Sequence, residues 1–214
     1  MRDERTEDDA TRSVISRWTD KLRAAAGLEL PYPSRVALPG RASAVLALFA
    51  LETAGDEESL SILLTQRSET VGKHPGQIAF PGGVLDPDDE NFEGLRTTAL
   101  RETEEEMGID RSQIEVLGRL PDLCTLTGFV ISPFLGILRA PHPEVSWQLS
   151  EREIADALWV PLSRLREAGV YSREKVPGTP FETDVYCVDH FRVWGATAAI
   201  LKNILDRMDR LGLD

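Results

Sequence analysis

Two spacings of apolar residues recur along the 214-residue chain, and they predict a mixture of helices and strands. Between residues 10 and 26 the apolar side chains return every three or four positions, which indicates a helix that ends near Gly27. The strongly polar residues 1–12 are expected to be disordered. Apolar runs at 42–51 and 59–67, separated by the acidic turn AGDEE, predict two strands.

The rest of the chain continues this mixture of strands and helices. Further strands are predicted at 114–120, 129–138, 156–162 and 185–189, and helices at 92–107, 162–168 and 194–208. The fold class is therefore α/β (α+β), with mostly short strands and one long internal helix. Residues 1–40 are expected to form an N-terminal helical arm followed by an extended connector at 30–40. Residues 41–214 are expected to form one domain, because no repeat or low-complexity linker divides them.

The predicted helix at 92–107 carries a group of acidic residues in its last turns. Side chains three and four positions apart lie on one helix face, so Glu102, Glu105 and Glu106 converge while Glu104 points away. Three converging carboxylates repel one another unless a cation lies between them. Oxygen ligands of this kind suit Mg²⁺ or Mn²⁺. The spacing therefore predicts a divalent-metal site.

The neighbours of these glutamates favour the metal site over a simpler interpretation. A run of glutamates is usually a solvated acidic face. That interpretation does not account for the Pro-Gly-Gly turn at 81–83 or for Arg101 directly ahead of the glutamates. Glycine permits a close approach of the backbone to a ligand, as a metal site beside a tight turn requires.

Composition narrows the class of protein and its partners. The formal net charge of −12 argues against binding to nucleic acid or to an anionic membrane, since both attract basic proteins. An anionic substrate must then be attracted locally, by bound cations and a few basic side chains. Cys124 and Cys187 have no metal-site spacing, so we expect reduced, buried thiols. With no signal-peptide pattern and no membrane-spanning apolar run, we expect a cytoplasmic protein.

The segment RETEEEMGI at 101–109 resembles the second half of the Nudix hydrolase signature, G-x5-E-x7-R-E-U-x-E-E-x-G-U, in which U is apolar. Glu93 lies eight residues before Arg101, as the signature requires, and Thr103 is its one weak apolar position. Gly83 lies ten residues before Glu93 instead of six, so the loop ahead of the helix is longer by four residues. The resemblance implies a Nudix-type α/β/α sandwich with a mixed sheet and one long catalytic helix.

The segment LLTQRSETVGKHPGQIAFPGG at 63–83 is similar to L-L-T-x-R-S-x3-R-x3-G-x3-F-P-G-G, which marks the coenzyme A diphosphatase branch of this family. Gly72 occupies the place of the internal arginine, with Lys73 beside it, and the closing VDHFRVWGATAAIL also resembles the branch. The resemblance implies hydrolysis of coenzyme A or its thioesters to 3′,5′-ADP and (acyl-)4′-phosphopantetheine. The alternatives are ADP-ribose, NADH or a nucleoside triphosphate as substrate. A catalytically silent nucleotide-binding regulator is disfavoured by the three retained glutamates.

The resemblance also assigns roles around the acidic helix. Gly82 would offer its backbone carbonyl to Mg²⁺ or Mn²⁺, and Glu102, Glu105 and Glu106 would bind the cation. Glu102 is also a candidate base for the attacking water. Arg101 would hold the glutamates in place through charge-assisted hydrogen bonds.

Further candidates lie outside the signature. Glu153 resembles the loop glutamate that some Nudix enzymes use as a metal ligand or base, and Glu151 competes for this role. Arg67, Lys73 and His74, which precede the glycine pair, are the expected phosphate contacts.

The remaining side chains with chemical potential are expected to be structural. His142 and His190 have no partner at metal-ligand spacing. Trp194 falls on the apolar face of the predicted terminal helix, so we expect it in the core. The N-terminal arm and the terminal helix could each pack on the core or on a second subunit, which leaves a homodimer open.

Overall fold

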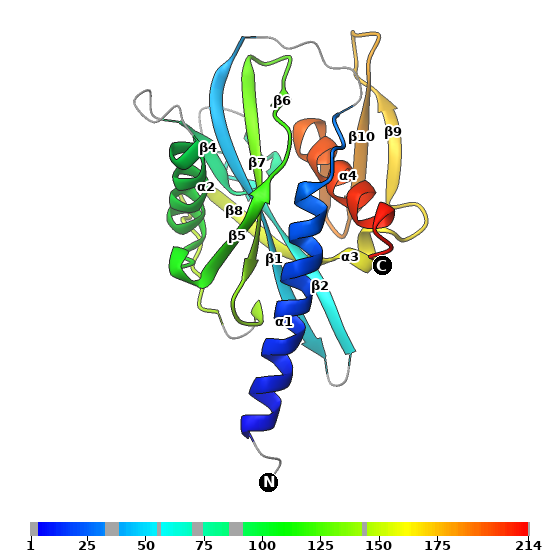
Figure 1. Cartoon of the computed structure of the whole chain (residues 1–214). Coiled ribbons are helices and arrows are strands. Elements are labelled where there is room, and N and C mark those ends of the chain that lie inside the picture. The colour runs from blue at the N-terminus through cyan, green and yellow to red at the C-terminus, as the bar shows by residue number, and fades with distance from the viewer. Residues whose placement is uncertain are drawn as a thin grey trace.

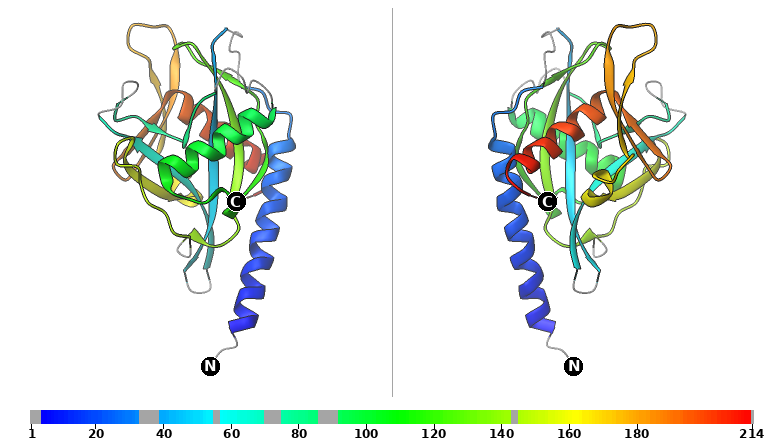
Figure 2. Two further views of the ribbon diagram at one scale, coloured as in Figure 1. Left: turned by 90° about the vertical axis from the view of Figure 1, so that its left-hand side faces the viewer. Right: turned by 90° about the vertical axis from the view of Figure 1, so that its right-hand side faces the viewer.

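The computed structural model describes residues 4–32, 39–54, 57–69, 75–85, 92–142 and 145–213. The helices of these ranges are α1 (Glu4–Gly27), α2 (Phe92–Met107), α3 (Leu162–Leu165) and α4 (Gly195–Arg210), with a short 3-10 helix, η2 (Arg111–Gln113). A large mixed sheet separates α2 from α1 and α4 (Figure 1). The side views in Figure 2 show α2 and α4 on opposite faces of this sheet. The described chain is therefore an α/β/α sandwich.

The large sheet has β1 at its centre. Its strands are β1 (Arg41–Ala54), β2 (Glu57–Arg67), β3 (Ile78–Ala79), β4 (Gly82–Val84), β5 (Ile114–Arg119), β6 (Leu123–Cys124), β7 (Phe129–Leu138) and β8 (Ile154–Pro161). The main path runs β3-β2-β1-β7-β5, while β4 pairs with β1, β6 with β7 and β8 with β2. β1 and β7 are parallel, whereas β1 with β2 and β2 with β8 are antiparallel. A smaller antiparallel sheet is formed by β9 (Tyr171–Lys175), β10 (Glu182–Val188) and β11 (Phe191–Trp194).

β1 is buried on both faces, which explains its unbroken apolar sequence. Leu46 and Leu48 belong to the core on the side of α2, whereas Phe49 and Leu51 belong to the core on the side of α1 and α4. Successive strand side chains point to opposite faces, so this strand contributes to both cores. Its pairing with β4 places Gly82 and Gly83 against α2, which packs on both strands.

The structure confirms the predicted fold class and corrects the start of the first helix. The expectation of disorder is wrong over residues 4–12, because α1 begins at Glu4, and residues 1–3 lie outside the described residues. No glycine or proline interrupts residues 4–26, and early acidic residues suit the positive end of the helix dipole. The connector predicted at 30–40 lies partly outside the described residues. β4 and β6 are three and two residues long, too short to produce a readable periodicity.

Two expectations about burial are also wrong. Trp194 is 40% exposed because it ends β11, where Phe191 and Val193 face the core and Trp194 faces the other side. Of the two free cysteines, Cys124 is half-buried and Cys187 is exposed. Within the described ranges, no helix combines the length and the apolar character needed to cross a bilayer.

Arg207 joins α4 to the end of α1. Its fully buried guanidinium donates to the carbonyl oxygens of Ala25 (3.0 Å), Leu28 and Leu30 (2.8 Å). Its Nε donates to Oδ1 of Asn203 at 2.7 Å. Burial lowers the pKa of Arg207. The last carbonyl groups of a helix lack partners within the helix and carry the negative end of its dipole, so they stabilise a buried cation there.

We expect Arg207→Met to lower the free energy of unfolding by about 2–4 kcal/mol, because it removes the four hydrogen bonds of a fully buried guanidinium group. Urea unfolding followed by circular dichroism measures this loss. Arg210→Met, at an exposed position of the same helix, is the matched control and should change the stability little. Equal stability of the two variants would contradict the role given to Arg207.

Candidate active site

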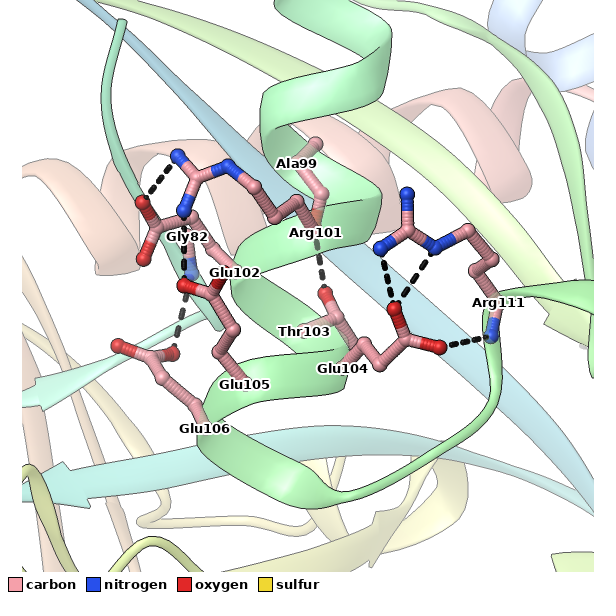
Figure 3. Close-up of polar contacts among 9 residues, drawn as sticks. All are labelled: Gly82, Ala99, Arg101, Glu102, Thr103, Glu104, Glu105, Glu106 and Arg111. Atoms are coloured by element: carbon pink, nitrogen blue, oxygen red, sulfur yellow. Dashed lines mark hydrogen bonds and ion pairs between the residues drawn. The ribbon is translucent and has the colours of Figure 1, made fainter.

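The acidic residues of α2 divide between two faces of the helix, as Figure 3 shows. Arg101 Nη2 lies 2.7 Å from Glu102 Oε1, and Nη1 lies 2.7 Å from Glu105 Oε2. On the other side of the helix, Glu104 pairs with the guanidinium of Arg111. The predicted orientation of Glu104, away from the other glutamates, is therefore confirmed.

β4 lies directly against these glutamates and begins at Gly82, where the sequence predicted a turn. Gly82 has a φ of +153°, a backbone conformation that residues with a side chain rarely adopt. Its N–H donates to Oε2 of Glu106 at 3.2 Å. A Cβ atom on Gly83 would lie 2.5 Å from the carboxylate carbon of Glu102. A Cβ atom on Gly82 would instead lie 2.3 Å from Ala44 O of β1. The missing side chain of Gly83 therefore allows β4 to approach Glu102 of α2, and that of Gly82 allows β4 to pack on β1.

The loop after Val145 caps the end of α2 and carries Glu153 to the same place. The N–H of Gln148 donates to Met107 O at 2.7 Å, and the N–H of Ser150 donates to Glu106 O at 2.9 Å. These are carbonyl groups that the helix leaves unpaired at its C-terminus. From the other side, the carbonyl of Glu153 accepts a hydrogen bond from Ser68 N at 2.8 Å.

Glu102, Glu106 and Glu153 form the acidic cluster: each offers a carboxylate oxygen, and these oxygens lie within 4.8 Å of one another. Three carboxylates at this separation match the oxygen ligands that a hard divalent cation such as Mg²⁺ or Mn²⁺ takes. The donor set therefore fits such a cation. Glu105 lies outside this group and is about half exposed, bonded to Arg101.

Burial dominates the electrostatics of the acidic cluster. It raises the pKa of Glu106 to about 8; the Gly82 N–H and Arg67 lower this pKa, while Glu102 and Glu153 raise it. Burial also raises the pKa of Glu102, and the hydrogen bond from Arg101 opposes that rise. Without a cation, the site therefore favours protonation of a carboxyl group.

The other candidates from the sequence fall in different places. Arg67 Nη1 lies 3.6 Å from Oε1 of Glu106, a contact that no sequence motif announces. Lys73 and His74 lie outside the described residues. Glu151 is exposed and is not part of the acidic cluster.

The two remaining histidines pair with carboxylates away from the acidic cluster. His142 Nε2 lies 2.9 Å from Glu52 Oε1, and its ring stacks on Trp159 at 5.3 Å between centroids. His190 Nε2 lies 2.6 Å from Asp156 Oδ2, linking the turn between β10 and β11 to β8. Both contacts are those of structural histidines.

Comparison with known proteins assigns this fold and site to a family. The NUDIX domain matches residues 40–177. A Nudix hydrolase of Citrobacter koseri, named NudL and described as uncharacterized, is 37% identical over 145 residues, which make up 67% of this chain and 72% of the relative. NudL of Salmonella newport matches over the same shares. A MutT/nudix family protein from Enterococcus faecalis shares the fold, with a TM-score of 0.54 and 17% identity over 93% of this chain and 73% of that chain.

The fold and the acidic helix are those of a hydrolase class that generally uses divalent metal ions. The chain belongs to the Nudix family and is a Nudix hydrolase.

We expect Gly83→Ala to weaken metal binding without unfolding the protein. The atoms nearest to the new methyl group would be those of the flexible end of Glu102, so it would push that carboxylate out of the acidic cluster. Titration with Mn²⁺ measures the affinity, and thermal melting measures the fold. Gly27→Ala, where a Cβ meets nothing within 4 Å, is the control. Unchanged Mn²⁺ affinity in Gly83→Ala would contradict this account.

We expect Glu106→Gln to remove both the metal response and a pH dependence of stability. Because the folded pKa of about 8 exceeds the ordinary 4.5, the stability that Glu106 contributes to the metal-free protein is full below pH 4.5. It is lost as the pH rises through 8. The wild-type Tm should therefore fall more steeply than that of Glu106→Gln between pH 5 and 9, and Mn²⁺ should restore it in the wild type alone.

Glu104→Gln provides the matched control, since Glu104 lies on the opposite side of the same helix and pairs with Arg111. It should keep both the pH dependence and the Mn²⁺ response of the wild type. A Tm increase with Mn²⁺ in Glu106→Gln equal to that of the wild type would rule out Glu106 as a ligand.

Proposed function

We propose that this Nudix hydrolase cleaves the phosphoanhydride of coenzyme A or its thioesters, with Mg²⁺ or Mn²⁺, to 3′,5′-ADP and (acyl-)4′-phosphopantetheine. The observation that supports this substrate is the position of the segment at 63–83, which resembles the coenzyme A diphosphatase branch. Its described part borders the acidic cluster at three points, since Arg67 faces Glu106, Ser68 N bonds to Glu153 O and Gly82 N bonds to Glu106. Residues that resemble a substrate signature thus lie where a diphosphate would be cleaved.

The acidic cluster and Gly82 would hold the cation, with Glu105 as a further ligand at its exposed edge. When bound, the cation would neutralise the phosphate charge and acidify a water molecule. Arg101 keeps Glu102 oriented through a 2.7 Å bond and stabilises its charged form. Glu153 is exposed at the rim of the cluster, so it is the better placed of the two candidate bases to accept the proton from the attacking water.

The phosphates of the substrate would be bound by basic side chains of the same segment. Arg67 borders the acidic cluster, and Lys73 and His74, which lie outside the described residues, follow it in the sequence. Positioning and charge neutralisation supply most of the catalysis in phosphoryl transfer. A fork of two N–H groups, such as Arg67 provides, can hold two phosphate oxygens at once.

A second substrate class is supported by one feature of the sequence. Gly72 replaces the arginine of the coenzyme A branch, and Lys73 beside it supplies a point charge but no fork. A Nudix hydrolase of another nucleoside diphosphate derivative, such as ADP-ribose or NADH, or of a nucleoside triphosphate, is therefore the alternative.

A substrate panel with Mg²⁺ and with Mn²⁺ separates the two. We expect kcat/KM for coenzyme A to exceed that for ADP-ribose, NADH and a nucleoside triphosphate by roughly tenfold or more, because each lost specific contact weakens transition-state binding. Chromatography of the products should show 3′,5′-ADP and 4′-phosphopantetheine. A clear preference for ADP-ribose would overturn the coenzyme A assignment and leave the hydrolase assignment intact.

The same substrate panel tests whether Glu153 is the general base. Glu153→Gln should lower kcat for every substrate by roughly 100-fold, the usual contribution of a general base. Glu151→Gln, two residues away and outside the acidic cluster, is the control and should retain activity. The reverse result would assign the base to Glu151.

A further inference from the structure

Arg67 is the cation that faces the most buried carboxylate of the acidic cluster. The side chain of Glu106 is 2% exposed and that of Arg67 is 25% exposed, with 3.6 Å between Nη1 and Oε1. This distance is that of an ion pair, longer than a hydrogen bond. We infer that Arg67 is an exchangeable counter-ion, which neutralises Glu106 in the metal-free enzyme and gives up that carboxylate when a divalent cation binds.

The backbone of Arg67 is fixed, so an exchange would involve its side chain alone. Arg67 N donates to Gln77 O at 3.0 Å, and Arg67 O accepts from Gly76 N at 3.1 Å. The N–H of Ser68 donates to Glu153 O. The pairing of β2 with β8 shifts register between Gln66 and Arg67, so Arg67 lies at an irregularity of the strand, where side chains are commonly re-aimed.

Arg67 and Arg101, which both border the acidic cluster, are held very differently. Arg101 makes two bonds of 2.7 Å, to Glu102 and Glu105, and both partners are carboxylates of its own helix. Arg67 comes from another element and makes the longer contact with Glu106. An incoming cation would therefore displace Arg67 from its carboxylate more readily than Arg101.

Repulsion between the metal ion and the guanidinium of Arg67 favours the release of Arg67 when the metal binds. A dication and a guanidinium beside one carboxylate repel each other, and burial strengthens that repulsion because the surroundings screen it poorly. Arg67 therefore competes with the metal for Glu106 and raises the metal concentration needed for binding. Its release would leave a guanidinium beside the newly bound cation, available for a substrate phosphate, a step that rests on the proposed function.

Metal affinity without substrate tests the counter-ion directly. We expect Arg67→Gln to bind Mn²⁺ roughly tenfold more tightly than the wild type in calorimetric titration, because a competing buried charge is removed. Arg67→Lys keeps the charge and should stay within about twofold of the wild type. Arg96→Gln removes an equal charge from α2, at an ion pair of the same 3.6 Å length with Glu93 that is more exposed, and should also leave the affinity unchanged.

Weaker or unchanged Mn²⁺ binding by a folded Arg67→Gln protein would overturn the inference.

The wild type offers a second measurement that needs no stable variant at this position. The Nε–Hε resonance of Arg67 in an NMR spectrum should shift on titration with Mg²⁺, and it should remain still in Glu106→Gln, where the ion pair is already absent. A resonance that does not move in the wild type would also overturn it. Because no substrate is present, these outcomes are independent of which diphosphate the enzyme cleaves.

Discussion

The mutual repulsion of three carboxylates within 4.8 Å of one another is the constraint around which this site is organised. The positive groups that oppose this repulsion come from different parts of the chain: Arg101 from α2, Arg67 from the end of β2, and the N–H of Gly82 from the start of β4. Burial raises the pKa values of Glu102 and Glu106 despite these three contacts. The site is thus preformed but electrostatically incomplete, which is what a cation-binding site requires.

The contacts that stabilise the fold around α2 also position the residues of the acidic cluster. The hydrogen bonds that cap the C-terminus of α2 also fix the loop that carries Glu153, so ending the helix and completing the cluster are one event. β1 acts similarly, because its two buried faces unite the cores on both sides of the sheet while its edge pairs with β4. A substitution that loosens either contact would therefore affect both the stability and the chemistry.

Much of this could be predicted from sequence, because the strongest signals are local. The helical phase of the glutamates, the position of Gly108 after α2 and the apolar runs of the strands all depend on residues close in sequence. The ion pair of Arg67 with Glu106 spans 39 positions and has no periodic or turn signature. The prediction that Trp194 is buried failed at an element boundary. β11 ends at Trp194 and α4 begins at the next residue, so the predicted helix was one position too long. The loop glutamate could be placed near the site only through resemblance, because its position depends on backbone hydrogen bonds that any residue can make.

The contact of Arg207 with the end of α1 has a consequence for how the protein is made. Its guanidinium and the carbonyl of Ala25 are separated by 182 positions in the chain. At translation rates of about 5–20 residues per second, the helix emerges roughly 10–40 seconds before its partner does. During that interval the carbonyl groups at its end lack the guanidinium of Arg207, and its apolar face has no finished sheet to cover. The first helix to be synthesised therefore completes its polar contacts only after the last helix has been made.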